Sequence, residues 1–474
     1  MSEVLQPDLC VIGAGSGGLS VAAAAAAFGV DVVLIEKGKM GGDCLNYGCV
    51  PSKALIAAGR RAHEMRSAQK FGIIPTNPSI NFQAVHDHVK GVIAAIEPND
   101  SVERFTGLGV KVIEAPARFV DKNTVMAGDY EITARRVVIA TGSSPMVPPI
   151  PGLDSVPYFT NETIFENQSY IDHLIVIGGG PIGMELAQAH RRLGSRVTVV
   201  EAMTALGKDD TELTDILLKS LRNEGIEIRE GTRVEALAND GDLIRVMVSE
   251  NGVESELKGS HILVATGRKP NVDDLNLATA DIKYDHRGIK VSKGLKTSNK
   301  RVYAIGDVIG DLQFTHVANY HAGLVVRNAL FRMPVKVNND IIPWVTFTDP
   351  ELAHIGLAED EARKRYGDIN VLRWTYQEND RAQAQRATNG SIKVITRKNG
   401  KILGATIVGE SAGEIIQMWA LAVSQNLKIS AMAGYVSPYP TFSEINKRAA
   451  IVYYLPKLSN QLVQKVVGFL AKLG

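Results

Sequence analysis

The chain has 474 residues, of which 45% are hydrophobic and 22% charged, and its formal net charge at pH 7 is +1. This size predicts a globular protein of roughly two to four domains, and the near-neutral charge gives no electrostatic basis for binding nucleic acid. Glycines and Asp31 interrupt the apolar stretch 17–36, and the first residues show no basic region of an export signal. We therefore expect a cytoplasmic protein.

Residues 8–36, the first glycine-rich segment, predict a strand, a tight turn, an Ala-rich helix and a second strand. Such a turn lets the backbone approach a pyrophosphate group at the helix N-terminus. Its three spaced glycines are Gly13, Gly15 and Gly18. Glu36 ends the second strand, where its carboxylate can accept hydrogen bonds from ribose hydroxyls. Cys10 falls in the first strand and is predicted to be a buried hydrophobic residue without a catalytic role.

Residues 41–53, GGDCLNYGCVPSK, contain two of the three cysteines, Cys44 and Cys49. A five-residue step on a regular α-helix advances about 7.5 Å, whereas a disulfide prefers Cα atoms roughly 4.4–6.8 Å apart. Three glycines give the backbone the freedom to distort until the sulfurs meet: Gly41, Gly42 and Gly48. Pro51 suits the first turn of the next helix, so Cys49 lies beside a helix N-terminus with Lys53 one turn on. Both features favour a thiolate, and the pair predicts a reactive dithiol.

Two other uses of the cysteines fit the sequence less well. A structural disulfide is typical of small secreted domains, whereas this chain is long and has three cysteines. A zinc site requires about four ligands, and no second Cys/His cluster has a matching spacing, so we expect no metal.

The same arrangement recurs in residues 171–201, the second glycine-rich segment, with these residues: Gly178, Gly180, Gly183 and Glu201. The first glycine precedes the terminal glutamate by 23 residues in both copies, from 13 to 36 and from 178 to 201. Agreement in glycines, context and spacing predicts two dinucleotide sites. The alternative is that one copy is a vestigial packing unit.

The cysteines indicate which nucleotide each site should hold. Because Cys44 lies eight residues after Glu36, the first site should bind the cofactor that exchanges electrons with sulfur. A flavin accepts a hydride and passes electrons to a disulfide, so we assign FAD to the first site and a nicotinamide dinucleotide to the second. Glu201 would repel a 2′-phosphate, and residues 202–204 offer no arginine to bind one, which favours NADH over NADPH.

Segments 130–150 and 259–271 each contain an apolar strand that ends in Ala-Thr-Gly, and we interpret both as crossovers between domains. Their glycines are expected to lie near nucleotide. Asp307 follows another short apolar strand, where it either binds a polyol chain or is an ordinary turn residue.

After residue 341 the pattern predicts an antiparallel sheet with helices at 357–366 and 411–426, and hence a third domain. The final residues place apolar side chains on one helical face and lysines elsewhere: Leu458, Leu462, Val466, Phe469 and Leu473, with Lys457, Lys465 and Lys472. We expect this face to pack on the protein itself or on a second subunit. A membrane-surface helix is the alternative.

The motifs together resemble those of the flavin-dependent pyridine nucleotide–disulfide oxidoreductases, in particular the dihydrolipoamide dehydrogenases and mercuric reductases. They extend over essentially the whole chain and include GAGSGG, GGDCLNYGCVPSK, ATGSSP, GGGPIGMELA, ATGRKPN, YAIGD and PWVTFTDPELAHIG. The resemblance implies an α/β fold with two Rossmann-like dinucleotide-binding domains and a C-terminal α+β dimerisation domain. We assign FAD binding to 1–150 and 271–340, NAD binding to 151–270, and the interface of a homodimer to 341–474.

The resemblance also implies individual roles. Cys49 would lie against the flavin as a charge-transfer thiolate, and Cys44 would exchange with substrate. Lys53 would sit near flavin N5, paired with Glu185. Further cofactor contacts are expected from Asp307 on the ribityl chain, from the backbone of Ala117 at the adenine end, and from Lys37, Gly42, Asp43, Thr141, Gly142, Gly267 and Thr315.

One position departs from the dihydrolipoamide and glutathione reductases, which carry a His-Pro-Thr-x-Ser-Glu motif whose histidine serves the partner subunit's cysteines as acid and base. Here Tyr439 takes the place of the histidine and Glu444 that of the glutamate. Tyrosine is a poor base at neutral pH because its pKa is about 10, against about 6.5 for histidine. Mercuric reductases resemble this chain in the tyrosine, but they also carry a cysteine pair near the C-terminus. This chain has no cysteine after Cys49, which counts against efficient Hg(II) reduction.

We therefore predict an NADH-dependent flavoprotein that moves electrons between nicotinamide, FAD and the Cys44–Cys49 pair, to or from a small thiol or disulfide substrate. One alternative is a mercuric reductase-like metal reductase that uses NADH or NADPH. Others are a flavin NADH oxidase or transhydrogenase that does not need the dithiol, and a redox-sensing or membrane-docking dimer.

Overall fold

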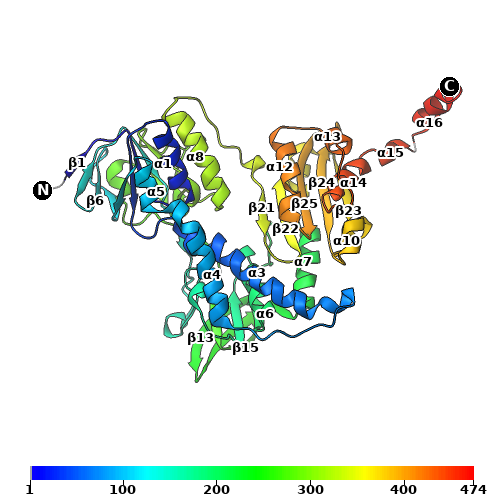
Figure 1. The fold of residues 1–474 in the computed structure, drawn as a ribbon, viewed down its shortest axis with the longest axis horizontal. Helices are drawn as coiled ribbons and strands as arrows, with labels where there is room; N and C mark the ends of the chain where they lie inside the picture. Colours follow the sequence, from blue (N-terminus) through cyan, green and yellow to red (C-terminus); the bar gives the residue numbers. More distant parts are fainter. Residues whose placement is uncertain (1–2, 459, 474) are drawn as a thin grey trace. The chain divides into compact units, whose positions relative to one another are not determined.

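The computed structural model describes residues 3–458 and 460–473, and Figure 1 shows its helices and strands. The chain forms two compact units. Unit 1 contains Met1–Ala68, Ile74–Ala202 and Ile228–Val337, and so holds both glycine-rich segments and the three cysteines. Unit 2 contains Gln69–Ile73, Met203–Glu227 and Asn338–Gly474.

A five-stranded parallel sheet organises the first glycine-rich segment. Its strands are, in order across the sheet, β20 (Val302–Ala304), β8 (Arg136–Ile139), β2 (Leu9–Ile12), β3 (Val32–Glu36) and β4 (Lys111–Glu114). Leu9 and Val11 belong to one hydrophobic cluster, whereas Cys10 and Ile12 belong to another, so both faces of the sheet are buried. Cys10 is thus a core residue, as predicted, and burial raises its pKa to about 12.

Helix α1 (Ser16–Ala27) follows the first glycine turn and packs beside α8 (Thr315–Ala329) on one face of this sheet. Both β20 and α8 follow the second glycine-rich segment in the chain. The polypeptide therefore returns to the first sheet after that segment is complete. Between β3 and β4 run α2 (Gly42–Asn46), α3 (Cys49–Arg66), α4 (Phe82–Ile96) and α5 (Val102–Gly107). A smaller sheet contains, in order, β1 (Glu3–Leu5), β7 (Tyr130–Ile132), β6 (Val125–Ala127) and β5 (Ala117–Phe119).

The second glycine-rich segment also lies in a sheet, with α6 (Pro181–Arg192) after its turn. The strands are, in order, β12 (Ile226–Arg229), β11 (Arg196–Val200), β10 (His173–Ile177) and β16 (His261–Val264). An antiparallel sheet precedes β16 in the chain: β13 (Thr232–Asp240), β14 (Leu243–Glu250) and β15 (Val253–Gly259). The predicted crossovers pair with each other through β9 (Ser143–Pro145) and β17 (Arg268–Pro270), and a short hairpin, β18 (Tyr284–Asp285) and β19 (Gly288–Ile289), comes before β20.

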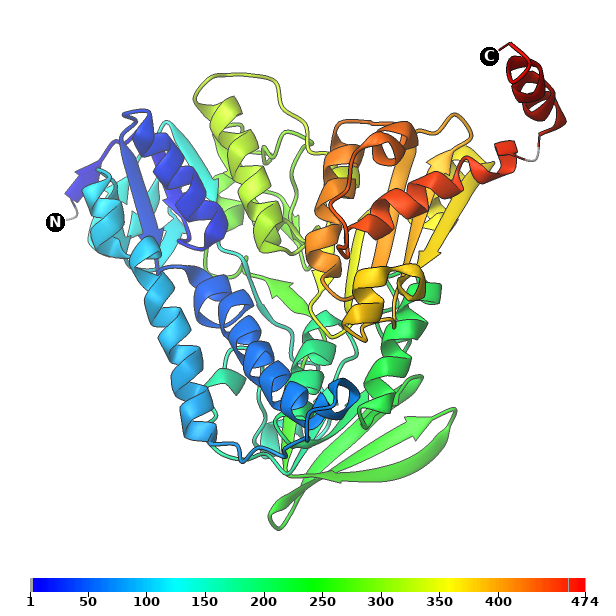
Figure 2. The ribbon, with the colours of Figure 1, turned by 45° about the vertical axis from the view of Figure 1, so that its right-hand side comes forward.

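Unit 2 is built on an antiparallel sheet with, in order, β21 (Trp344–Thr346), β22 (Glu351–Gly356), β25 (Ile402–Gly409), β24 (Ser391–Arg397) and β23 (Ile369–Thr375). The predicted helices are present as α9 (Glu359–Tyr366), α11 (Ala412–Ile415) and α12 (Gln417–Ser424). Helices α10 (Asp380–Ala384), α13 (Ile429–Gly434) and α14 (Glu444–Val452) complete the unit. In Figure 2 the orange and red helices α12 and α14 cover one face of the sheet, where they share a hydrophobic cluster with β24 and β25.

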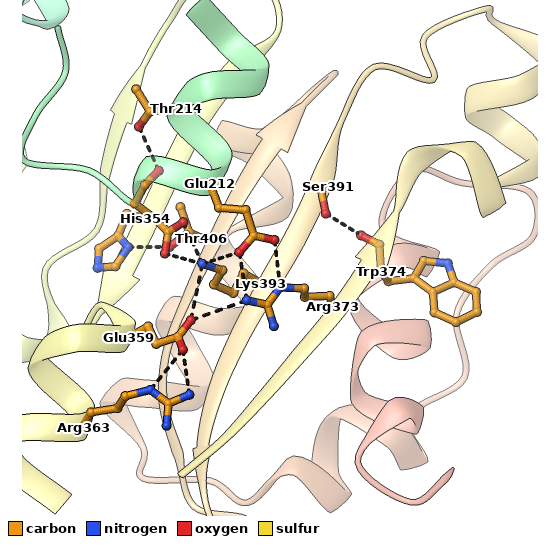
Figure 3. A network of polar contacts seen from close by, with 11 residues as sticks. Glu212, Thr214, His354, Glu359, Arg363, Arg373, Trp374, Ser391, Lys393 and Thr406 are labelled. Carbon is orange, nitrogen blue, oxygen red and sulfur yellow. Dashed lines mark hydrogen bonds and ion pairs between the residues drawn. The ribbon is translucent and has the colours of Figure 1, made fainter. Parts of the chain in front are cut away.

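The other face of this sheet holds α7 (Thr211–Asn223) through a buried ion-pair network, drawn in Figure 3. The Lys393 ammonium on β24 lies 2.8 Å from both carboxylate oxygens of Asp210 and 2.7 Å from Glu212. The Lys393 and Asp210 side chains are only 6% and 7% exposed, so the charges compensate each other out of water. Arg373 on β23 pairs with Glu212 through two bonds, at 2.7 and 2.8 Å. This network attaches α7 to the sheet.

The α/β fold with two Rossmann-like regions and a C-terminal α+β region is as predicted. One feature was not anticipated: α7 follows the second glycine-rich segment in the chain, within the predicted range 151–270, yet it belongs to unit 2. The chain ends in α15 (Leu455–Leu458) and α16 (Gln461–Leu470). Among the described residues, no helix is both long and apolar enough to cross a membrane.

Candidate active site

The first glycine turn is a close-packed backbone cradle. Gly13 has φ +104°, and a Cβ on it would lie 2.4 Å from the carbonyl oxygen of Ala140. A Cβ on Gly18 would lie 1.8 Å from the Gly13 carbonyl oxygen, so both positions require glycine. Glu36 accepts hydrogen bonds from the backbone N–H groups of Ala14, at 2.6 Å, and Gly38, at 2.8 Å. The carboxylate is therefore held at the turn, as a ribose-binding group must be.

The second turn repeats this cradle. Gly178 has φ +113°, and its Cβ would lie 2.4 Å from the Ala265 carbonyl oxygen. A Cβ on Gly183 would lie 2.1 Å from the Gly178 carbonyl oxygen. Glu201 accepts a hydrogen bond from the Gly179 N–H at 2.7 Å.

Within the described part of the chain, the helices that leave both turns begin without a side-chain cap. No described side chain caps α1 or α6, whose N-cap residues are Gly15 and Gly180. The first N–H groups of these helices thus suit a pyrophosphate. Cradle, acidic residue and uncapped helix together fit a dinucleotide at each turn.

The cysteine segment packs directly on the first cradle. Gly42, with φ +59°, approaches Gly15 so closely that a Cβ would lie 2.7 Å from the Gly15 Cα. Helix α2 carries Cys44, the helical structure is interrupted at Tyr47 and Gly48, and α3 begins at Cys49. The break is the distortion that the spacing predicted. Cys44 is half-buried and Cys49 exposed, and the structure has them as free thiols.

The two sulfurs differ strongly in acidity. A hydrogen bond from Cys44, helped by Thr315 and by the charge of Lys53, lowers the pKa of Cys49 to about 6. These interactions outweigh the partial loss of solvent around its sulfur, although the residue as a whole is exposed. The Cys49 sulfur lies 3.3 Å from the Thr315 hydroxyl. The same hydrogen bond with Cys49, followed by burial, raises the pKa of Cys44 well above its ordinary value. Since Cys49 also begins a helix, the site stabilises one thiolate and one thiol.

An ion pair joins the cysteine helix to the second glycine-rich segment. Lys53 on α3 lies 2.8 Å from Glu185 on α6, and the Glu185 side chain is only 7% exposed. Close packing accompanies the pair, since a Cβ on Gly59 would lie 3.0 Å from the Ala189 carbonyl oxygen. The structure thus brings together the two residues that the resemblance paired.

Asp307 belongs to a polar cluster that sequence reasoning did not find. Asp307 accepts a hydrogen bond from the Ser143 hydroxyl at 2.6 Å, and burial raises its pKa despite that bond. Arg268 donates to the same hydroxyl at 2.7 Å and lies 3.1 Å from Asp43. Ser143 and Arg268 stand in the ATGSSP and ATGRKPN segments, so the pairing of these crossovers was the missed signal.

The remaining predicted contacts lie in the two crossover segments and beside the first sheet. Thr141 donates its hydroxyl to the Asn271 carbonyl oxygen at 2.7 Å, and Gly142 and Gly267 have φ +69° and +137°. Ala117 begins β5 and packs against the core of the first sheet, and Lys37 is exposed immediately after β3.

Tyr439 and Glu444 belong to unit 2, whereas the cysteines belong to unit 1. Tyr439 is 68% exposed and donates its hydroxyl to Asp380 at 2.7 Å, a bond that raises the pKa of Tyr439 above its ordinary value. Glu444 begins α14 and lies 2.8 Å from Arg448. The tyrosine's partner is therefore Asp380, a residue that the family motif did not suggest.

Comparison with known proteins identifies the family of this chain. A family model described as pyridine nucleotide-disulphide oxidoreductase matches residues 7–322, and the model of that family's dimerisation domain matches 342–450. The chain is 36% identical to a mercuric reductase of Bacillus cereus, over 94% of this chain and 71% of that protein. It is 34% identical to a dihydrolipoyl dehydrogenase of Staphylococcus aureus, over 94% of this chain and 96% of that protein.

Among solved structures, the flavoprotein disulfide reductase RclA from Escherichia coli, described as HOCl-induced and as a Cu(II) complex, superposes with a TM-score of 0.84. It shares 26% identity over 96% of this chain and 100% of that one. The motifs, the two dinucleotide cradles and these matches lead to one conclusion: the chain belongs to the pyridine nucleotide–disulphide oxidoreductases, a family of flavoproteins that use FAD and NAD(P)H.

Proposed function

We propose that this chain works as a homodimer that passes electron pairs between NADH, FAD and the Cys44–Cys49 pair, and from there to or from an external thiol or disulfide. The observation that carries the proposal is the placement of the cysteines: their segment packs on the first cradle through Gly42 and Gly15, and Cys49 begins α3 with Lys53 one turn on. The pKa of Cys49, lowered by its hydrogen bond with Cys44, agrees with this placement. In this proposal residues 1–150 and 271–340 bind FAD, 151–270 bind NAD, and 341–474 form the dimer interface. A reducing compartment such as the cytoplasm suits working thiols.

The first half-reaction breaks the Cys44–Cys49 disulfide. Bound FAD supplies the hydride and electron-pair chemistry that links nicotinamide to sulfur. When the disulfide accepts two electrons and one proton, Cys49 retains the negative charge and Cys44 the proton, as their pKa values require. Lys53 and the N-terminus of α3 hold the thiolate in place.

The second half-reaction starts at Cys44. Cys44 attacks an external disulfide, so that one S–S bond forms to the substrate while the substrate's own S–S bond breaks, and the thiolate that leaves takes up the proton of Cys44. The Cys49 thiolate then attacks Cys44, which restores the internal disulfide and releases the second thiolate. The same steps in reverse oxidise a dithiol.

The choice of nicotinamide follows from Glu201. Its carboxylate is held at the second turn by the Gly179 N–H, where the ribose of a dinucleotide is expected. A 2′-phosphate would meet a negative charge there, which supports NADH over NADPH.

Tyr439 supports a second candidate acceptor, a thiophilic metal ion. Exchange with a disulfide needs a base for the attacking thiol, and Tyr439 is a poor one because its hydrogen bond to Asp380 raises its pKa further. Thiolates bind soft metal ions directly. Mercuric reductases among the relatives, and the Cu(II) complex of RclA, are consistent with this candidate.

The test is a screen of acceptors with wild-type protein and with Cys44→Ser and Cys49→Ser variants. We expect NADH-dependent reduction of one acceptor class by the wild type and its loss in both variants. Anaerobic NADH should also produce a long-wavelength absorbance band that the Cys49→Ser variant lacks. Turnover that persists after Cys44→Ser would instead indicate an NADH oxidase or transhydrogenase.

The Tyr439→His variant separates the two acceptor classes. A gain of lipoamide activity on introducing histidine would support a disulfide active site that lacks its base. High lipoamide activity in the wild type would show that the tyrosine does not limit disulfide exchange. Oxidation of NADH that depends on Hg(II) or Cu(II), and is unchanged by the substitution, would support the metal candidate.

A further inference from the structure

The last helix, α16, has one strongly apolar side that no other described part of the chain covers. Six of its side chains are between 41% and 71% exposed: Leu462, Val463, Val466, Val467, Phe469 and Leu470. At about 100° per residue these six fall within an arc of roughly 160°. In Figure 2, α16 is the dark red helix at the C-terminus. Asn460 begins it by accepting hydrogen bonds from the N–H groups of Leu462 and Val463.

The charge of this region has one sign. Residues 445–474 contain no aspartate or glutamate, whereas Lys465 lies in α16 and Lys472 in the turn after it. By the same helical geometry, Lys465 lies on the polar side with Gln461 and Gln464, at the edge of the apolar arc. A short helix with an apolar face bordered by lysines is typical of segments that lie in the headgroup layer of a membrane.

We propose that α16 docks this enzyme on an anionic lipid surface. The apolar side enters the boundary between headgroups and acyl chains, and the lysines contact lipid phosphates. Ten residues correspond to about 15 Å of helix, half the thickness of a bilayer core, so α16 lies on the surface and does not span it.

Two observations favour a lipid surface over a second copy of the chain. The family's dimerisation model matches 342–450 and ends before α15, so α16 lies outside the matched dimerisation region. The complete absence of acidic residues in 445–474 complements an anionic surface, whereas this chain as a whole has 52 basic and 51 acidic residues. Residues 1–444 carry 52 − 5 = 47 basic and 51 acidic residues, so the net charge of −4 outside this region is small for its length.

The experiment is cosedimentation of the FAD-loaded full chain with vesicles of phosphatidylcholine alone or mixed with phosphatidylglycerol. We expect binding to the mixed vesicles that weakens with salt. The pair of substitutions Lys465→Gln and Lys472→Gln should lower the affinity about tenfold or more. The matched pair Lys219→Gln and Lys364→Gln, which neutralises two exposed lysines of unit 2, should leave it unchanged.

A chain that ends at Tyr454 should lose vesicle binding and keep its NADH-dependent activity. Equal binding of wild type to neutral and mixed vesicles would overturn the role of the lysines. Absence of vesicle binding, together with a dimer-to-monomer shift on truncation, would overturn the proposal in favour of a contact between subunits. The outcomes that would overturn the proposal are read from lipid binding and mass, so they do not depend on identifying the substrate.

Discussion

The two glycine-rich segments of unit 1 have almost the same turn, but different structures follow them. Their first glycines have φ +104° and +113°, and their glutamates accept backbone hydrogen bonds at 2.6 and 2.7 Å. Eight residues after Glu36 the chain places Cys44, and then the helix that begins at Cys49. Nine residues after Glu201 it places Asp210, whose carboxylate is buried against Lys393 in unit 2.

The comparison shows that the cradle is a general nucleotide-binding structure, and that the chain attached to it determines what each copy contributes. In the proposed function, the segment after the first cradle supplies redox sulfur. The segment after the second supplies a structural attachment for α7. Function in this family thus lies in side chains added to a repeated backbone.

The largest expected effect concerns the attachment of α7. Replacing Lys393 by methionine leaves the buried Asp210 carboxylate without its cation, which should lower the free energy of unfolding by about 3–5 kcal/mol. All three tryptophans lie in unit 2, so their fluorescence in a urea titration reports this unit. The control is Lys398→Met, which breaks an exposed pair with Asp368 and should cost at most about 1 kcal/mol. Equal losses in the two variants would contradict a stabilising role for the buried network.

The next effect separates the two cradles. A Cβ on Gly15 would meet only the Gly42 Cα, at 3.9 Å, and one on Gly180 would meet no protein atom within 4 Å. Alanine therefore fits both positions in the protein, but it would obstruct a pyrophosphate. Gly15→Ala should weaken FAD retention about 100-fold, while Gly180→Ala should keep FAD and lower kcat/KM for NADH by a similar factor. Flavin absorbance and NADH kinetics measure the two effects, and loss of FAD from Gly180→Ala would show that the sites are assigned wrongly.

A smaller effect distinguishes the two glutamates. Glu201→Ala removes the negative charge that faces a 2′-phosphate, so the ratio of kcat/KM for NADPH to that for NADH should rise about tenfold. Glu36→Ala, the equivalent change in the first copy, should reduce FAD affinity and leave that ratio unchanged. If both substitutions altered the ratio equally, the second copy would not be the nicotinamide site.

The smallest effect is a shift in the acidity of Cys49. Above pH about 6 this residue is a thiolate, and its reaction with iodoacetamide in the reduced protein should decline as pH falls below that value. Cys44→Ala removes the hydrogen bond that contributes most, and should raise the pKa of Cys49 by about one unit. Lys53→Met should raise it by less. In both variants the reaction of Cys49 with iodoacetamide should therefore begin to decline at a higher pH than in the wild type. An unchanged profile in Cys44→Ala would contradict the hydrogen bond between the sulfurs.

Much of this protein follows from short-range sequence constraints. Gly13 and Gly178 need backbone angles that side chains oppose, and the start of α3 at Cys49 follows from Pro51 and the glycine break. The antiparallel sheet predicted after residue 341 is present as β21 to β25, because strand propensity depends on residues that are near in the chain. The resemblance added the roles of Lys53 and Glu185, which are 132 residues apart and which composition and spacing alone do not connect.

The partners of residues that are distant in the chain became apparent only from the folded protein. The sequence alone indicates neither that α7 belongs with the C-terminal sheet, nor that Arg268 meets Asp43, nor that the tyrosine in the histidine position pairs with Asp380. Periodicity and turn chemistry act over a few residues, whereas these contacts arise when separate elements pack and buried charges require compensation. Local sequence patterns therefore predicted the helices and strands, but they did not predict the polar networks that join them.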